Sequence, residues 1–320
     1  MRIEVNKREY VPPFIRRLKA IQTLKGCVTI AVHDGKFHPD EIIAVAMIKE
    51  AAPDINVKVM RTRNGLELNK ADICIDVGDG EFDHHTTAEY YPNGVPYAAC
   101  GKVLRAVEKN KFVINFLNKM TLYNVQAADN GDLSMLPPDC NLNYFTWIHS
   151  MNPTADEARA SSDRKALYDE RFNETLELTC KIYHRIHACA VGRLKNKDAD
   201  ETNDITVLMD GKIIELKDKY VRWQKYAAAH KELLVILSPE TDGTRYHLRM
   251  CPVDNDRFVC RKYPPPDWFG KVTKDLESVT RIKGSIFCHR NGHVMAFENR
   301  DAALLAAKRI VTMQIKKSRI

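Results

Sequence analysis

The chain has 320 residues, of which 44% are hydrophobic, so it can bury a core and is expected to form two domains. Its 49 Lys and Arg residues against 42 Asp and Glu residues give a formal charge of +7, which suits a polyanionic substrate without identifying one. No apolar run approaches the length of a membrane span, and nine cysteines without a CxxC pair argue against a zinc–thiolate ribbon and for reduced thiols in a cytoplasmic protein.

The first 25 residues carry seven Lys or Arg against two Glu and lack the apolar core of a signal peptide. This basic arm is compatible with a packed first helix or with a targeting remnant, and the two Glu residues favour packing.

The part of the chain that follows combines predicted strands with helices. Apolar, β-branched runs predict strands at residues 27–32, 56–61 and 71–77, and residues 40–51 predict a helix that is apolar around most of its surface. Strands without polar alternation favour a mostly parallel sheet flanked by helices. Residues 97–194 are predicted to be mainly helical and to cover this sheet. We therefore expect an α/β domain with its site at the carboxyl ends of the strands.

A second unit is predicted beyond residues 195–204, KNKDADETND, which contain one apolar residue in ten and indicate a linker or exposed loop. Runs from ITVLMD to HVMAF (205–297) predict strands of a largely antiparallel sheet, and residues 300–313 predict a final helix. The expected boundaries are 1–195 for the first domain and 196–320 for a smaller α+β domain.

The loop HDGKFHPDE directly follows the first predicted strand. It supplies His33, Asp34, His38 and Asp40 just before a helix begins. These side chains can bind a metal, although Asp40 is equally well placed to cap the helix, where the dipole and unpaired amides favour a carboxylate.

Two further segments supply similar groups. Asp76 ends the run DICIDV, and Asp83, His84 and His85 follow it in EFDHH. Asp129 lies in QAADNGD, where a helix is expected to end. Asp76 and Asp129 are each compatible with an ordinary turn.

Together these residues predict a metal site. Imidazoles and carboxylates without a thiolate suit Mn²⁺, with Mg²⁺, Co²⁺ or Zn²⁺ as alternatives. Seven or more such groups exceed the needs of one ion, which indicates two ions about 3.5 to 4 Å apart with a shared carboxylate, as in many phosphoryl-cleaving sites. We nominate Asp76 as the shared ligand.

HDGKFHPDE, DICIDVGDGEFDHH and AADNGD resemble, in order and spacing, the motifs of the Myg family of DHH-like phosphoesterases. The resemblance covers almost the whole chain, since VMRTRN, MNPT, YPPPDWFG and SIFCHRNG also have counterparts in the family. It implies a catalytic N-terminal DHH-type domain, a smaller C-terminal domain that closes over the substrate, and Mn²⁺-dependent hydrolysis of phosphodiesters. Members with an assigned activity act as 3′ to 5′ exonucleases on RNA.

The resemblance also implies roles for individual residues. The metal ligands it implies are His38, Asp40, Asp76, His84 and Asp129, with His33 or Asp34 completing the first metal's shell. His85 would face the substrate phosphate, and Asp83 would orient an imidazole. In the mechanism that we expect, His85 or a metal-bound water protonates the leaving oxygen.

The chain departs from the family at two places. Most members have Asn where this chain has Asp34, and a Phe-Ile pair followed by two glycines where this chain has His293, Val294, Met295 and Ala296. Side chains in place of the glycines would crowd a phosphate that approaches backbone N–H groups.

Several basic residues are candidates for phosphate contacts, with solvated surface charge or satisfied polar contacts as the alternative. They are Arg61, Arg63, Arg261, His289, Arg290 and His293. The expected function is a metal-dependent hydrolase, a two-metal 3′–5′ exonuclease on single-stranded RNA or short oligonucleotides.

Two other functions remain open from the sequence. A pyrophosphatase or dinucleotide phosphodiesterase would use the same metal site with another substrate pocket. A non-catalytic RNA-binding protein would stack bases on Tyr90, Tyr91, Tyr97 or the Trp268–Phe269 pair. The chain lacks GxSxG, GxxxxGK[ST] and GxGxxG signatures, which argues against acyl transfer, nucleotide triphosphatase and dinucleotide-cofactor chemistry.

Overall fold

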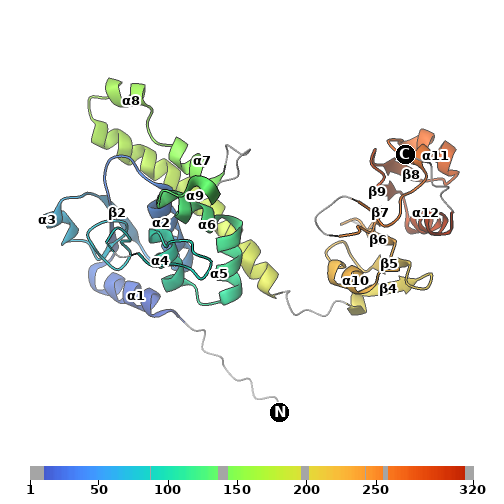
Figure 1. Cartoon of the computed structure of the whole chain (residues 1–320), viewed down its shortest axis with the longest axis horizontal. Helices are drawn as coiled ribbons and strands as arrows, with labels where there is room; N and C mark the ends of the chain where they lie inside the picture. Colours follow the sequence, from blue (N-terminus) through green and yellow to red (C-terminus); the bar gives the residue numbers. More distant parts are fainter. Residues whose placement is uncertain are drawn as a thin grey trace, which may run out of the picture. The chain divides into compact units, whose positions relative to one another are not determined.

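The structure is a computed structural model that describes residues 11–86, 88–135, 143–195, 202–241, 243–254 and 259–313. The chain divides into two compact units, Met1–Asp198 and Ala199–Ile320 (Figure 1). Most of the predicted linker, residues 196–201, lies outside the described residues. Within the basic arm, Pro13–Lys25 forms helix α1 with Phe14, Ile15 and Leu18 buried, and residues 1–10 lie outside the described part.

The first unit contains a three-stranded sheet of order β2-β1-β3. Strands β1 (Val28–Val32), β2 (Val57–Arg61) and β3 (Ile73–Cys74) are all parallel. With helices around this sheet, the predicted α/β class with a parallel sheet is confirmed. Strand β3 is shorter than the predicted 71–77 because Asp76 has a left-handed φ of 57°, which turns the chain out of the sheet.

Helix α2 (Pro39–Ala51) forms the centre of this unit, and every residue from Pro39 to Ile48 is buried. A helix that is buried on all sides needs apolar residues around its circumference, as the sequence predicts. It packs against α4 (Ala99–Val107) and the long helix α9 (Arg164–Lys195).

The remaining helices complete the first unit. They are α3 (Gly65–Leu68), α5 (Lys111–Leu117), the π-helix η1 (Asn118–Leu122), α6 (Tyr123–Asp129), η2 (Leu133–Met135), α7 (Tyr144–Ser150) and α8 (Ala155–Ala160).

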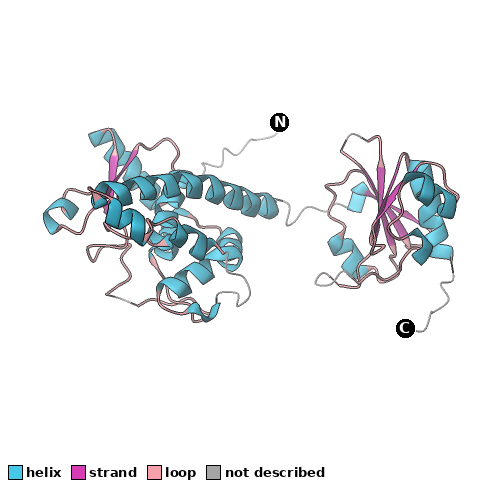
Figure 2. Cartoon of the chain, turned by 90° about the horizontal axis from the view of Figure 1, so that it is seen from above, coloured by secondary structure: helices cyan, strands magenta, loops and turns pink. Residues whose placement is uncertain are grey.

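The second unit contains a six-stranded mixed sheet of order β4-β5-β6-β7-β9-β8, drawn in magenta in Figure 2. Its strands are β4 (Ile205–Leu208), β5 (Ile213–Leu216), β6 (Val235–Pro239), β7 (Tyr246–Met250), β8 (Ser285–Cys288) and β9 (Val294–Phe297). All neighbouring pairs are antiparallel except β5 and β6, which are parallel, so the sheet is mixed but largely antiparallel, as the sequence predicts.

Helices cover both faces of this second sheet. Consecutive residues of β5 face opposite sides of the sheet. Ile213 belongs to the core beneath α12 (Arg300–Thr312), and Ile214 belongs to the core beneath α10 (Gln224–Ala229). Two further helices, η4 (Pro266–Trp268) and α11 (Thr273–Thr280), and the short η3 (Thr202–Asp204) complete the unit.

In the part of the chain that the structure describes, no helix combines the length and apolarity needed to cross a membrane. The cytoplasmic location stays a prediction.

Candidate metal centre

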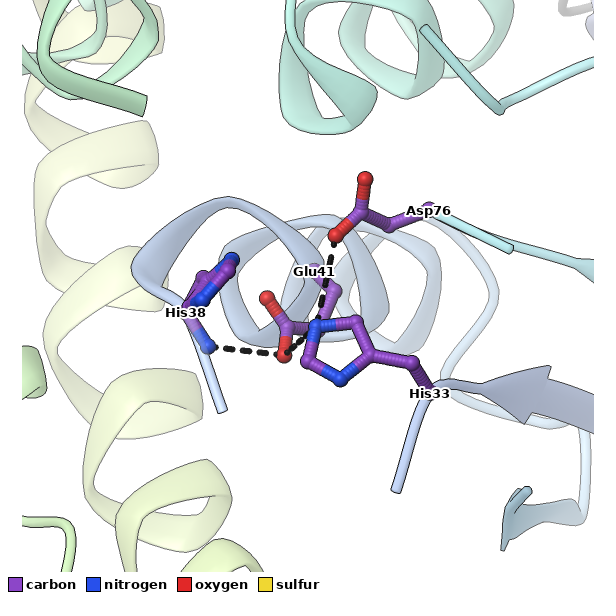
Figure 3. Close-up of side chains that lie close together, drawn as sticks. All are labelled: His33, His38, Glu41 and Asp76. Carbon is purple, nitrogen blue, oxygen red and sulfur yellow. Dashed lines mark hydrogen bonds and ion pairs between the residues drawn. The ribbon is translucent and has the colours of Figure 1, made fainter. Parts of the chain in front are cut away.

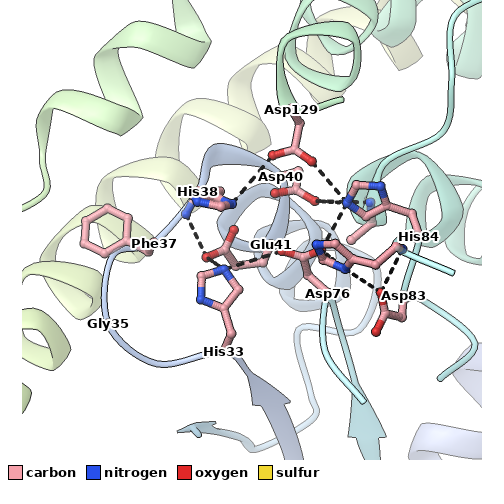
Figure 4. Close-up of polar contacts among 12 residues, drawn as sticks. His33, Gly35, Phe37, His38, Asp40, Glu41, Asp76, Asp83, His84 and Asp129 are labelled. Carbon is pink, nitrogen blue, oxygen red and sulfur yellow. Dashed lines mark hydrogen bonds and ion pairs between the residues drawn. The ribbon is translucent and has the colours of Figure 1, made fainter. Parts of the chain in front are cut away.

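The parallel pairing of β1 with β3 places their carboxyl ends at one edge of the sheet. His33 follows β1, and Asp76 lies two residues beyond β3. Helix α2 begins at the same edge with His38 as its N-cap, and Asp40 lies in its first turn. Residues 83–85, called the DHH loop, and the end of α6 bring His84 and Asp129 to this point, so segments far apart in the sequence converge (Figure 4).

One group of possible ligands consists of His33, His38, Glu41 and Asp76, whose ligand atoms all lie within 4.8 Å of one another (Figure 3). Nε2 of His33 lies 3.1 Å from Oε1 of Glu41 and 3.5 Å from Oδ2 of Asp76. Apart from His38, these side chains are nearly completely buried.

The second concentration of ligands surrounds His84. Its Nε2 lies 3.1 Å from Oδ1 of Asp76, 3.1 Å from Oδ2 of Asp129 and 3.9 Å from Oδ2 of Asp40. Nδ1 of His38 lies 3.8 Å from the other oxygen of Asp129. These contacts correspond to two further groups that could hold a cation, Asp76–His84–His85 and His38–Asp40–Asp129.

Asp76 belongs to two of the three groups. Its Oδ2 is nearest to His33, and its Oδ1 is nearest to His84. The left-handed φ of this residue costs about 1–3 kcal/mol for a non-glycine residue in general, and Asp tolerates it better than most. Such backbone strain at a buried carboxylate is common at functional sites.

Four buried atoms of the cluster have no hydrogen-bond partner among the described residues. They are His33 Nε2, Asp40 Oδ1, Glu41 Oε2 and Asp76 Oδ1. His33 Nε2 lies 3.1 Å from Oε1 of Glu41, and Asp76 Oδ1 lies 3.1 Å from Nε2 of His84. Neither contact has the alignment of a hydrogen bond. Ligand atoms that share a cation face a common point instead of each other, so the donor set fits a divalent metal.

The pKa shifts of the clustered side chains also fit a cation site. Burial raises the pKa of Asp40, and the negative charges of Asp129, Asp76 and Glu41 raise it further. Burial opposes a charge on His33 and His84, but neighbouring carboxylates outweigh it and raise the pKa of each imidazole to about 10. The same imidazoles lower the pKa of Asp76 against the effect of burial. Protons on these groups partly compensate for charges that a cation would neutralise directly.

Glu41 is the residue that the sequence analysis did not nominate. Its Oε1 accepts the backbone N–H of His38 at 2.8 Å, which completes a capping box, so its position after Asp40 indicates a cap. The same carboxylate is fully buried, and its Oε2 is unpartnered among the described residues. The complete burial of this capping carboxylate distinguishes Glu41 as a candidate ligand. Only the tertiary structure shows that burial.

Asp34 lies beside the cluster but outside the three groups. Its carboxylate is 2.7 Å from the guanidinium of Arg63, and both side chains are substantially exposed. The structure therefore places His33, and not Asp34, in a candidate ligand group with Asp76.

Asp83 holds the DHH loop in shape. Its carboxylate accepts the backbone N–H groups of Asp79 and His85 and lies 2.7 Å from Nδ1 of His85. The buried Lys102 donates to the backbone carbonyl of Asp83. Asp83 thus contacts the imidazole of His85, whose side chain is 58% exposed, and His84 faces inward to the carboxylates.

The other predicted substrate contacts lie in different surroundings. Arg61 is buried, and its guanidinium bonds to Asp169 and the carbonyl of Gly35. Arg261 donates to the carbonyls of Ala227, His230 and Leu233 in the second unit.

The basic turn HRNGH joins β8 to β9 in the second unit. The rings of His289 and His293 lie 4.1 Å apart at its two ends, and Arg290 lies between them in sequence. Met295, one of the two residues that stand where the resemblance implies glycines, is buried in the core and pairs with Leu248 across the sheet.

The aromatic candidates for base stacking differ in exposure. Tyr91 is buried and stacks on Tyr97 at 3.8 Å, and Trp268 is buried in the second unit. Tyr90 is 63% exposed.

The fold and the cluster together define an α/β protein with a candidate binuclear cation centre. A family model named MYG1_exonuc, described as an uncharacterised protein family (UPF0160), matches residues 29–311. The chain therefore belongs to the MYG1 family, as its motifs predict, while the placement among DHH-like phosphoesterases stays a prediction.

Relatives in distant organisms support this membership. The chain is 25% identical to a MYG1 protein of Chlamydia pneumoniae over 88% of this chain and 95% of the relative. It is 25% identical to a MYG1 protein of Saccharomyces cerevisiae over 87% and 94% of the two chains. It is 24% identical to a Mus musculus protein named MYG1 exonuclease over 87% and 83%. Membership supports a nuclease or phosphoesterase role.

Proposed function

We propose that this protein is a Mn²⁺-dependent two-metal phosphodiesterase that removes nucleotides from the 3′ end of RNA. The observation that carries the proposal is the position of Asp76, whose two carboxylate oxygens face two different groups of buried ligands. A single carboxylate shared in this way is the arrangement that two-metal phosphoryl-cleaving sites use. Family membership and the mouse relative's name as an exonuclease support the choice of a nucleic acid substrate.

The ligands divide between two cations. His33, Glu41 and Asp76 would hold one ion, and Asp40, Asp76, His84 and Asp129 would hold the other, with His38 close to both groups. The mixture of imidazole nitrogen and carboxylate oxygen suits Mn²⁺. When bound, the ions supply Lewis acidity that lowers the pKa of water and neutralises charge on the phosphate.

His85 is the protein group that this proposal assigns to the leaving oxygen. Its exposed ring stands beside the buried ligands, 3.6 Å from Asp76, and Asp83 orients it through Nδ1. With Nδ1–H donated to Asp83, the imidazolium form of His85 would carry a second proton on Nε2, which could contact the phosphate and be delivered to the leaving oxygen. Proton transfer of this kind contributes about 10²- to 10⁴-fold to the rate.

The substrate contacts are part of the same proposal. In the first unit, Arg63, which pairs with Asp34, would contact the phosphates of a single-stranded RNA or short oligonucleotide. In the second unit, His289, Arg290 and His293 are separate candidates for phosphate contacts, since their side chains can donate hydrogen bonds to phosphate oxygens.

One assay tests the activity, the metal requirement, the sugar preference and the direction together. 5′-labelled RNA and DNA oligonucleotides are incubated with Mn²⁺ or with EDTA, and pyrophosphate and a dinucleotide are offered in parallel. We expect RNA to shorten progressively from its 3′ end with Mn²⁺ alone, and Asp76→Asn to be inactive. Preferential hydrolysis of pyrophosphate or of dinucleotides would replace the proposal by the small-substrate alternative, and cleavage that persists in EDTA would contradict the metal mechanism.

A further inference from the structure

The loop between the ligands His33 and His38 is held by side chains from elsewhere in the first unit. Phe37 is fully buried, and both of its backbone groups bond to Asn152. Its N–H donates to Oδ1 of Asn152 at 2.9 Å, and its carbonyl accepts from Nδ2 at 2.8 Å. A primary amide offers one acceptor and two donors in one plane, so it can satisfy both groups of a peptide residue as a strand would.

Asn152 is itself fixed. It is 9% exposed and lies between α7 and α8, and its Nδ2 also donates to the carbonyl of His149 at the end of α7. The position of α7 is therefore transmitted to the backbone one residue before His38. A backbone N–H and a carbonyl left without these bonds in a buried place would each lose a hydrogen bond.

Arg61, at the end of β2, holds the other half of the loop. One terminal nitrogen donates to the carbonyl of Gly35 at 2.5 Å, and the other donates to Asp169 of α9 at 2.9 Å. Its guanidinium lies over the rings of Phe172 at 4.7 Å and Phe37 at 5.8 Å. The side chain is 4% exposed, which leaves it little surface for a phosphate.

We propose that Asn152 and Arg61 are positioning residues that fix the loop of residues 34–37 and thereby set the separation of His33 and His38 at the cation centre. The inference rests on the metal centre of the proposed function and replaces the predicted phosphate contact of Arg61. A coordination site has to be held to within about 0.5 Å, and a loop between two ligands meets this requirement only if its backbone is anchored. The two side chains provide those anchors at Gly35 and Phe37.

Mn²⁺ binding to purified protein is the primary test, measured from the free Mn²⁺ signal by electron paramagnetic resonance. Asn152→Ala removes both bonds to Phe37, and Asn152→Asp keeps the acceptor for its N–H but removes the donor to its carbonyl. The matched control is Asn143→Ala. Asn143 caps the other end of α7 through Thr146 and has no bond to the loop among the described contacts, so its loss reports general destabilisation of the same helix.

We expect Asn152→Ala and Asn152→Asp to weaken the binding of one Mn²⁺ by about 10- to 100-fold, the usual effect of losing a group that orients a ligand. Asn143→Ala should bind both ions like the wild type. Wild-type affinity in both Asn152 variants, or an equal loss in Asn143→Ala, would overturn the proposal. If Asn152→Ala does not fold, Asn152→Asp decides.

Hydrogen exchange in EDTA gives a readout that does not involve the metal. The amide of Phe37 should exchange faster in Asn152→Ala than in the wild type, while amides of α9 keep their protection. Unchanged protection at Phe37 would show that Asn152 does not hold the loop.

Arg61→Lys separates positioning from phosphate binding, because an ammonium cannot bridge Gly35 and Asp169 as the guanidinium fork does. If Arg61 positions the loop, the Arg61→Lys variant should bind Mn²⁺ more weakly than the wild type. A phosphate contact predicts a raised KM for the oligonucleotide with unchanged Mn²⁺ affinity, and that result would overturn the role of Arg61.

The inference and the proposed function fail in different ways. Mn²⁺ binding that Asn152→Ala weakens, without any cleavage of RNA, would contradict the function and leave the positioning role standing. RNA cleavage by the wild type together with wild-type Mn²⁺ affinity in the Asn152 variants would contradict the positioning role alone.

Discussion

Nε2 of His84 lies 3.1 Å from Oδ1 of Asp76, although this buried oxygen forms no hydrogen bond among the described residues. The two atoms are close but not aligned as donor and acceptor. A cation between the carboxylate and the imidazole would satisfy both atoms, and neither would then have to face the other. This contact between the end of β3 and the DHH loop is the most direct geometric support for a metal centre.

Asp76→Asn should abolish Mn²⁺-dependent cleavage, because it removes the charge that both ligand groups share while keeping a residue type that tolerates the left-handed φ. The control is Asp79→Asn in the same loop, since Asp79 also has a positive φ, is exposed and belongs to none of the ligand groups. His85→Ala should lose only about 10²- to 10⁴-fold. Initial rates with a 5′-labelled RNA measure all three, and wild-type turnover in Asp76→Asn would contradict the site assignment.

Glu41→Gln should weaken Mn²⁺ binding by at least about tenfold, the lower end of the range for groups that support a metal. Glutamine can still accept the N–H of His38, so the metal-free protein should keep its helix cap. Loss of the Glu41 charge relieves repulsion with Asp40 and weakens attraction to His33, so these effects oppose each other and the unfolding temperature should stay near that of the wild type. Glu157→Gln is the matched control, since Glu157 completes an equivalent capping box on the exposed helix α8. Calorimetric titration and thermal unfolding check both parts. Normal Mn²⁺ affinity with a lowered unfolding temperature would show that Glu41 is a cap only.

Mn²⁺ affinity should increase with pH between pH 6 and 9. The pKa values of His33 and His84 are raised to about 10, so both imidazoles carry a proton over this range that a cation must displace. The association constant should therefore rise about tenfold per pH unit for each proton displaced. Titrations at a series of pH values, with proton release followed in weakly buffered solution, measure the slope. A pH-independent affinity would show that Mn²⁺ binding displaces no proton from these imidazoles.

A separate pH effect on stability is expected at His187 of α9, which belongs to none of the candidate ligand groups. Its Nε2 is 3.4 Å from Glu108 and its Nδ1 is 3.4 Å from Glu50. The contact with Glu108 raises the pKa of His187 above its usual value, with burial opposing this shift and Glu50 adding to it. A raised pKa in the folded state means that the stabilisation is fully present below about pH 6.5 and is lost as the pH rises through the folded pKa.

Urea unfolding in EDTA measures this contribution. His187→Gln should be less stable than the wild type at pH 5.5, and the difference in free energy of unfolding should shrink towards pH 9. A difference that stays constant over this range would exclude the ionic contribution.

Several features of the fold could be predicted from the sequence because they depend on local patterns. The β-branched runs predict β1 and β2, and the apolar circumference of residues 40–51 predicts a helix buried on all sides. The alternating runs likewise predict the largely antiparallel second sheet. The single parallel pair, β5 with β6, depends on the path of the chain between these strands and has no signature in the sequence of either strand.

The sequence by itself determined which segments carry the candidate metal ligands, since polar residues that follow parallel strands meet at one edge of the sheet. His33 and Asp76 come together for this reason alone. Only the tertiary structure decided how individual side chains are used. Asp34 lies against Arg63, and Arg61 lies buried against Asp169, 108 residues later in the chain. Burial and pairing of a charged side chain depend on partners brought from distant parts of the sequence, and no local pattern encodes them.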